Sequence, residues 1–206
     1  MCYIKETIPT IGDYNEGNIN KLNVLKEARR IGLIIPETII SSSKTAISKA
    51  NPMITKAIKD GFRLSIDNNL YHLKTHRVVT DEIPDYFAPT LFQKEIEKKF
   101  ELRIFYIDGI FYSMVIFSQQ DSRTEVDFRN YDYQNPTKTS PYQLPHEIEL
   151  KLKELMKNLK LSTGSIDMIY TVDNDYCFLE VNPTGQFGMI SIPCNYMIEK
   201  RIAELL

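Results

Sequence analysis

The chain has 206 residues, of which 43% are hydrophobic and 25% are charged, a composition typical of a soluble globular protein that can bury a core. Its formal net charge of −2 lacks the strong basic excess of bulk nucleic-acid binders, so no nucleic-acid partner is expected. No apolar run approaches the roughly 18 residues of a membrane-spanning helix, and the N-terminus is not a signal peptide, so no membrane partner is expected either.

The first predicted helix follows an irregular segment. Residues 1–18 contain proline and glycine and show no clear period. A helix is expected to start near Asn18 or Asn20, because the side chain of either residue can accept a hydrogen bond from the first turn. Gly32 is well suited to end this helix, since glycine tolerates the backbone conformation that follows a last turn.

The next part of the chain predicts short strands. Residues 33–40 are apolar and β-branched around a proline, which favours an edge strand. The polar residues 41–51 predict a short helix, and residues 53–58 a short strand. Residues 60–69 are rich in turn formers, and we interpret them as a mobile loop between strands that could act as a lid. Another strand is expected over residues 90–96.

A β-hairpin is the strongest local prediction in the middle of the chain. Two apolar, β-prone runs, 102–107 and 110–117, flank Asp108 and Gly109. An Asp-Gly pair in this position favours a two-residue hairpin turn. Residues 119–142 are polar and rich in turn formers, and are expected to form a loop over the surface.

The C-terminal part predicts two helices around a second hairpin. Residues 145–161 place apolar side chains at helical spacing on one face and charged side chains on the other. Residues 165–172 and 176–182 predict the second hairpin, and residues 195–206 a closing helix. Hairpins without a regular βαβ alternation indicate an α+β fold with antiparallel sheets covered by helices.

Three oxygen-bearing side chains on the second hairpin form a candidate metal site. Glu180 and Asn182 are two residues apart on one strand and therefore point to the same face. An even-numbered turn would place Asp167 opposite Asn182 on that face, whereas a three-residue turn without a bulge would turn Asp167 away. Carboxylate and amide oxygens suit a Mg²⁺ ion that also binds phosphate. The alternative is a solvent-facing side of a sheet with ordinary acidic residues.

The three cysteines, Cys2, Cys177 and Cys194, follow no metal-binding spacing. An odd number of cysteines without a secretory signal indicates reduced thiols. The chain is therefore expected to be cytoplasmic.

Residues 178–188 resemble the metal-binding strand of ATP-grasp ligases. They are most similar to the graspetide (microviridin-type) peptide maturases, in particular those of grasp-with-spasm gene systems. The resemblance extends from about residue 18 to the end of the chain. Further segments agree with this family in order: 20–22, 91–96, 101–104, 127–129, 164–167 and 193–196.

The resemblance implies the ATP-grasp fold, in which two α+β subdomains hold ATP. It divides the chain into an irregular segment 1–18, a small lid subdomain 19–92 and a C-terminal catalytic subdomain 93–206. Ligases of this type carry an additional N-terminal domain. This chain begins shortly before their central region, so we expect that domain to be missing, truncated or supplied by a separate chain. A homo-oligomer is the other partner considered.

The resemblance also assigns residues to the nucleotide. Lys21 and Lys56 would contact phosphates, with solvated surface lysines as the alternative. The segment Gln93, Lys94, Glu95 and Ile96 would lie beside adenine and recognise it through backbone groups. Glu101 would bind the ribose hydroxyls, unless it is an ordinary surface acid. Asp167, Glu180 and Asn182 would bind one or two Mg²⁺ ions that neutralise the β- and γ-phosphates.

Three further residues are expected to serve the reaction. Arg103 would stabilise charge on the transferred phosphoryl group, with a cross-strand ion pair as the alternative. Arg129 would hold a substrate carboxylate bidentately, because guanidinium and carboxylate geometries match. Asp127 would orient Arg129 or act as a base. A simple ion pair within a loop is the alternative for Asp127 and Arg129.

The function that the resemblance implies is ATP-dependent cross-linking of a ribosomal precursor peptide with a leader and a core. Side chains of Asp or Glu would be activated as acyl-phosphates and closed into macrocyclic esters or amides. Two other interpretations stay open at this point. One is an ATP-grasp ligase that acts on free amino acids or a protein C-terminus; the other is a non-catalytic peptide- or nucleotide-binding remnant.

Overall fold

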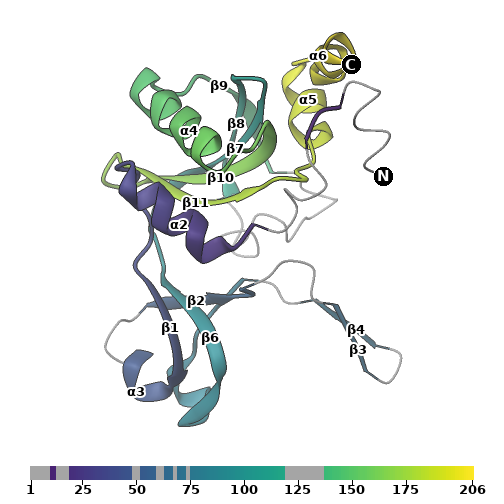
Figure 1. The fold of residues 1–206 in the computed structure, drawn as a ribbon. Coiled ribbons are helices and arrows are strands. Elements are labelled where there is room, and N and C mark those ends of the chain that lie inside the picture. The colour runs from purple at the N-terminus through teal and green to yellow at the C-terminus, as the bar shows by residue number, and fades with distance from the viewer. Residues whose placement is uncertain are drawn as a thin grey trace. The chain divides into compact units, whose positions relative to one another are not determined.

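The structure, a computed structural model, describes residues 10–12, 19–47, 52–58, 63–66, 69–72, 75–118 and 137–206. The chain forms two compact units (Figure 1). Unit 1 consists of Met1–Ile35, Lys98–Phe117 and Lys138–Leu206, and unit 2 of Pro36–Glu97 and Ser118–Thr137. These compact units have other bounds than the subdomains 19–92 and 93–206, which stay a prediction. Each unit is described by itself below.

Unit 1 is built on a five-stranded antiparallel sheet with the order β11-β10-β7-β8-β9. Its longest strands are β7 and β10; β11 forms one edge, and β8 and β9 extend the sheet to the other edge. The strands are β7 Lys98–Ile107, β8 Ile110–Ile116, β9 Thr139–Tyr142, β10 Thr163–Thr171 and β11 Tyr176–Asn182.

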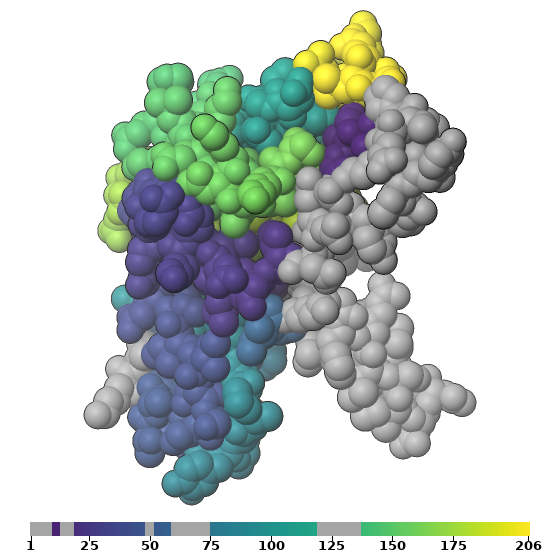
Figure 2. All heavy atoms as spheres, in the orientation of Figure 1, coloured from purple at the N-terminus to yellow at the C-terminus, as the bar shows by residue number. Residues whose placement is uncertain are grey.

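Two amphipathic helices, α2 (Lys21–Arg30) and α4 (His146–Asn158), cover one face of this sheet. Their buried side chains, among them Leu25 and Leu155, join one core with Leu102 of β7 and Ile166 of β10. Figure 2 shows the side chains of α2 (purple) against those of α4 (green), and Asn158 donates a hydrogen bond to Glu27 across the two helices. The face of the sheet under α2 and α4 is therefore the core face.

The C-terminal helices α5 (Gly188–Cys194) and α6 (Ile198–Leu205) pack at the other side of the unit. The ring of Phe187, just before α5, lies 5.7 Å from that of Phe105 of β7. Arg201 of α6 forms an ion pair with Asp108 in the β7–β8 turn at 3.2 Å.

Local sequence signals explain the first helix and the first hairpin, and both predictions are confirmed. The side chain of Asn20 accepts a hydrogen bond from the N–H of Leu22 and caps α2, and Gly32 ends the helix with φ +81°. Asp108 and Gly109 both have positive φ, 49° and 81°. A two-residue turn with this conformation joins strands at the right-handed twist that a sheet prefers.

Unit 2 is a four-stranded antiparallel sheet with the order β1-β6-β2-β5. A small core of Ile47, Met53 and Phe92 lies under it. Its elements are β1 Thr38–Ser43, α3 Lys44–Ile47, β2 Met53–Lys56, β5 His76–Arg77, η2 Thr80–Glu82 and β6 Tyr86–Lys94. A separate two-stranded hairpin is formed by β3 Arg63–Ile66 and β4 Asn69–His72.

Several predicted boundaries in unit 2 are wrong. The expected loop over 60–69 contains strand β3 and the start of β4. The edge strand predicted over 33–40 begins at Thr38, after Pro36, which cannot donate a ladder hydrogen bond. It extends through Ser43 because pairing with β6 overrides the weak β-propensity of serine. In β6 the strand starts at Tyr86 rather than at residue 90.

In the C-terminal part, the predicted helix 145–161 and the second hairpin are confirmed as α4 and as β10 with β11. The predicted surface loop 119–142 ends in strand β9, and its residues 119–136 lie outside the described part of the chain. The antiparallel sheets with covering helices confirm the α+β class. Among the described residues, no helix is long and apolar enough to cross a membrane.

Candidate functional site

The polar residues of unit 1 gather on the sheet face opposite the core. Along β7, Leu102 and Ile104 point into the core, so Glu101 and Arg103 point to the other side. Arg103 pairs with Asp167 of β10, which in turn pairs with Glu180 of β11. Paired residues share a face, and we call the side with these residues the polar face.

The register places Asp167, Glu180 and Asn182 on one face, as the metal prediction requires. Asp167 lies opposite Glu180, however, and Ser165 lies opposite Asn182. The partner predicted for Asp167 in an even-numbered turn, Asn182, is therefore wrong by two residues. The two carboxylates are direct cross-strand neighbours.

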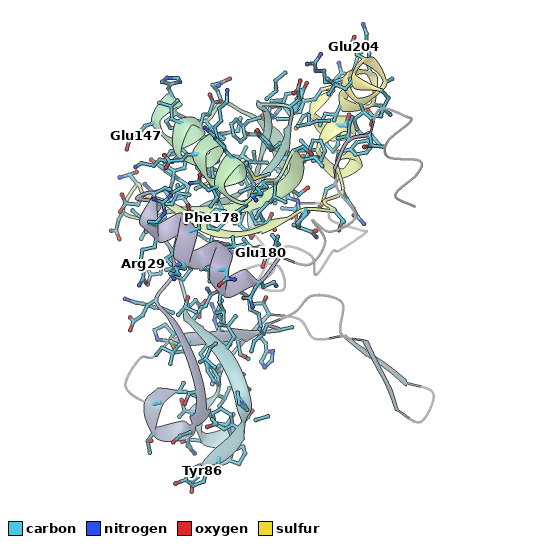
Figure 3. The ribbon with its side chains drawn as sticks, viewed as in Figure 1. Arg29, Tyr86, Glu147, Phe178, Glu180 and Glu204 are labelled. Carbon is cyan, nitrogen blue, oxygen red and sulfur yellow. The ribbon has the colours of Figure 1, made fainter. Side chains whose placement is uncertain are left out.

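A β-bulge in β11 makes this arrangement possible. Asp167 pairs with Glu180 and Met168 with Phe178, so Leu179 is an extra residue on β11. Without the bulge, Glu180 would share the face of Phe178, which is fully buried in the core. The bulge turns Glu180 to the polar face, beside the start of α2 (Figure 3).

Two ion pairs neutralise the carboxylates of the candidate metal site. Arg103 Nη1 lies 2.6 Å from Asp167 Oδ1 and 2.5 Å from Oδ2. Lys21 Nζ, from the first turn of α2, lies 3.2 Å from Glu180 Oε2. The four side chains are only 11–18% exposed. The cross-strand ion pair considered for Arg103 is thus present, and Lys21 is not a solvated surface lysine.

A third ion pair joins Glu101 to Lys98, a residue that the sequence analysis missed. Lys98 Nζ lies 2.7 Å from Glu101 Oε1, and the side chains are 6% and 9% exposed. Lys98 and Glu101 are three residues apart and would face opposite ways in a regular strand. The register shifts by one residue at Lys99, which brings Lys98 to the face of Glu101. No feature of the sequence predicts this second bulge.

The loop after β11 fixes Asn182. Asn182 Oδ1 accepts hydrogen bonds from the N–H and the hydroxyl of Thr184, both at 3.1 Å. The N–H of Gly185 donates to the carbonyl of Asn182. A Cβ on Gly185 would lie 2.0 Å from Ser165 Oγ and 2.5 Å from Ser165 N, so only glycine fits against β10 here. The amide oxygen of Asn182 must release a hydrogen bond before it can bind a metal.

An apolar pocket lies beside this loop within unit 1. Its volume is about 460 Å³, and Phe105, Phe187 and Ile202 are among its walls. Ser165 of β10 pairs with Phe105 of β7 on one side and with Asn182 of β11 on the other. The polar face therefore becomes apolar toward this end of β7 and β11.

Unit 2 carries the remaining predicted nucleotide residues that the structure describes. Lys56 is half-buried on β2 opposite Leu91 of β6, and Gln93 is two residues further along β6, on the same face. Gln93 is 1% exposed, and its Nε2 donates to Thr38 Oγ1 at 3.0 Å.

The segment expected beside adenine continues from the end of β6. The N–H of Lys94 donates to the carbonyl of Glu37, and the N–H of Glu95 donates to that of Pro52. The carboxylate of Glu95 forms an ion pair with Arg77 at 2.7 Å. Ile96 follows as a half-buried residue. Because these two N–H groups already donate hydrogen bonds, a nucleotide at this segment would bind other backbone groups of residues 93–96.

Unit 1 therefore brings together six of the predicted residues: Lys21, Glu101, Arg103, Asp167, Glu180 and Asn182. Asp127 and Arg129 lie outside the described residues. In the described part of the chain, no group of three or more His, Cys, Asp or Glu side chains forms a metal-binding cluster. Cys177 and Cys194 are buried and form no disulfide among the residues that the structure describes. The roles of all these residues stay predictions.

Solved structures provide the comparison for this geometry. The RiPP-associated ATP-grasp ligase of Chryseobacterium gregarium, in complex with ADP and a leader and core peptide, matches with a TM-score of 0.82 and 32% identity over 90% of this chain and 58% of that chain. The macrocyclase MdnC of Microcystis aeruginosa, bound with its precursor peptide MdnA, matches with a TM-score of 0.76 and 34% identity over 90% of this chain and 60% of that chain.

A more distant ligase shares the fold alone. The D-alanine–D-alanine ligase of Bacillus anthracis matches with a TM-score of 0.59 and 16% identity over 90% of this chain and 64% of that chain. No protein-family model matches the sequence, and no curated protein matches it. The chain spans 58% and 60% of the length of the two peptide-binding ligases. It has the ATP-grasp fold, and within the ATP-grasp ligases it resembles the RiPP-associated, peptide-modifying enzymes.

Proposed function

We propose that this chain provides the nucleotide- and metal-binding part of an ATP-dependent ligase that modifies a ribosomally made precursor peptide. The observation that carries the proposal is the polar face of unit 1, where two carboxylates lie between two basic side chains and an amide lies on the same face. The similarity to ligases solved with ADP and with leader and core peptides supports it. A cytoplasmic location and a partner chain or homo-oligomer belong to the same proposal.

The residues present fit a magnesium–nucleotide complex. Carboxylate and amide oxygens are the ligands that Mg²⁺ prefers, and this ion usually keeps phosphate oxygens among its other ligands. Asp167, Glu180 and Asn182 would hold it, and when bound it would neutralise charge on the β- and γ-phosphates. Arg103 Nε is buried and has no hydrogen-bond partner in the described structure. A buried donor of this kind is suited to an anionic ligand.

The other nucleotide contacts are proposed for each unit by itself. Lys21 and Lys56 would contact phosphate oxygens as compact positive charges. The segment 93–96 would bind adenine, with Gln93 held in place by its hydrogen bond to Thr38. Glu101 would accept hydrogen bonds from the ribose hydroxyls while Lys98 fixes its carboxylate.

The reaction has two balanced steps. A carboxylate oxygen of a substrate Asp or Glu attacks the γ-phosphorus of ATP, the bond to the bridging oxygen breaks, and ADP leaves an acyl-phosphate on the peptide. A Ser or Thr hydroxyl or a Lys amine then attacks the acyl carbon, loses its proton and expels phosphate. Arg103 would stabilise the developing negative charge. Arg129 would hold the substrate carboxylate, and Asp127 would orient Arg129 or accept the proton.

Two other functions are separated from this one by their products. A ligase for free amino acids or a protein C-terminus would also consume ATP but would leave a precursor peptide unchanged. A non-catalytic remnant would bind nucleotide or peptide without turnover. The ion-paired carboxylates on one face are the arrangement expected of a retained site, which favours the enzyme.

The test is ATP turnover coupled to peptide modification. The purified chain, with Mg²⁺ and ATP, should convert a precursor peptide to products that have lost one water per cross-link, as measured by mass spectrometry. Glu180→Gln should abolish ATP turnover and leave the fold intact, because it removes a carboxylate from the metal site. Glu147→Gln, on the exposed surface of α4, is the matched control and should retain turnover. Undiminished turnover in Glu180→Gln would refute the metal assignment.

A further inference from the structure

The carboxylates of the polar face are each held by a basic side chain of the same chain. Glu180 is paired with Lys21 at 3.2 Å, and Asp167 is paired with Arg103 through both of its oxygens. All four side chains are largely buried, with 11–18% exposure. A charge in such surroundings is strongly disfavoured unless an opposite charge lies beside it.

The same two carboxylates are the proposed ligands of Mg²⁺. A metal ion and the two basic side chains therefore compete for the same oxygen atoms. Arg103 Nη1 contacts both oxygens of Asp167, so a metal ion at this carboxylate shares its negative charge with the guanidinium group and is repelled by that group. Lys21 has the same effect on a metal ion at Glu180.

The charge balance shows when such a displacement is favourable. Two carboxylates and two basic side chains have a formal sum of zero. A divalent cation alone would add two positive charges to a largely buried face, where Lys21 and Arg103 would repel it. A polyphosphate that arrives with the cation supplies negative charge for both basic side chains.

We infer that Lys21 and Arg103 are resident counter-ions that keep free divalent cations off Asp167 and Glu180. These two carboxylates become available to a cation only when a nucleotide polyphosphate binds. The inference rests on the proposed function and adds a regulation of its metal site. Arg103 Nε, buried without a partner in the described structure, provides a donor for the incoming anion. Metal and nucleotide then increase each other's affinity by the same factor.

The experiment measures Mn²⁺ binding to the full chain without nucleotide, by electron paramagnetic resonance of the free ion. Mn²⁺ is a suitable probe because it accepts the same oxygen ligands as Mg²⁺. Lys21→Met and Arg103→Met should each bind Mn²⁺ about tenfold or more tightly than the wild-type chain, because one competing charge is gone. Lys26→Met, an exposed lysine on the same helix, changes the net charge equally and should leave the affinity unchanged.

A second measurement needs no variant. The wild-type chain should bind Mn²⁺ about tenfold or more tightly in the presence of ADP than alone, as read from the relaxation enhancement of water protons. Arg103→Lys, which keeps the positive charge, should resemble the wild type in nucleotide-free Mn²⁺ binding.

The outcomes separate this inference from the function on which it rests. If the wild-type chain binds Mg-ATP, but Lys21→Met and Arg103→Met bind free Mn²⁺ no better than Lys26→Met, the counter-ion role is refuted and the proposed function stands. Equal Mn²⁺ affinity of the wild-type chain with and without ADP would refute it in the same way. A chain that binds neither Mg-ATP nor Mn²⁺ with ADP would refute the proposed function itself.

Discussion

Replacing Lys98 by methionine should lower the free energy of unfolding by about 3–5 kcal/mol, because a buried carboxylate loses its charge partner. Lys98 and Glu101 are 2.7 Å apart, and their side chains are 6% and 9% exposed, so water cannot replace the lost ammonium group. Lys98→Met keeps most of the volume of the side chain, so the change is mainly electrostatic.

Removing both charges should restore most of this stability. The variant Lys98→Met/Glu101→Met leaves no unpaired charge, and we expect its free energy of unfolding to lie within about 1–2 kcal/mol of the wild-type value. The coupling free energy from the double-mutant cycle should then reach about 2–3 kcal/mol.

Urea denaturation of the full chain, followed by circular dichroism, provides the assay. Lys99→Met is the matched control: it removes the same charge at the next residue, where the exposed Lys99 contacts Asn174 and the ring of Tyr170, and should cost about 1 kcal/mol or less. A loss of under 1 kcal/mol in Lys98→Met, or no recovery in the double variant, would refute the reasoning for a buried ion pair.

Two further predictions concern packing and pH. Gly185→Ala should destabilise the chain by about 1–3 kcal/mol in thermal or urea unfolding, because its Cβ would lie 2.0 Å from Ser165 Oγ; Gly188→Ala, with no atom within 4 Å of the new Cβ, is the control, and equal effects would contradict the contact. Burial, together with the hydroxyl of Tyr142, raises the pKa of Tyr176, and burial also raises that of Tyr196. The free energy of unfolding should therefore hold below the ordinary tyrosine pKa of about 10 and fall above it, because the unfolded chain releases these protons first. Tyr176→Phe should lose less stability between pH 8 and pH 10.5, and a steeper loss would contradict the assignment.

The parts of the fold that the sequence predicts well are those governed by local chemistry. Asp108 and Gly109 adopt the positive φ that their turn requires, and Asn20 and Gly32 delimit α2 as a capping residue and a terminating glycine should. The long helix α4 follows from its apolar spacing. Each of these features can be predicted from neighbouring residues without knowing which distant parts of the chain pack against them.

The parts that the sequence does not predict depend on strand pairing. Strand β1 continues through serines because β6 lies beside it. The bulges at Leu179 and Lys99 each shift the register by one residue. The alternation of apolar and polar residues in the sequence does not reveal either bulge. For this reason the role of Lys98 was missed, and the partner of Asp167 was predicted as Asn182 instead of Glu180. The carboxylates themselves could be found, since they interrupt apolar strands.

The central claim is that this chain carries a magnesium-dependent nucleotide site. Calorimetric titration of the purified chain with ATP, with and without Mg²⁺, tests it most directly. We expect clear binding that depends on Mg²⁺ and is lost in Glu180→Gln. A cooperatively folded wild-type chain that releases no binding heat with Mg-ATP at any temperature tested, and whose melting temperature Mg-ATP does not raise, would contradict it.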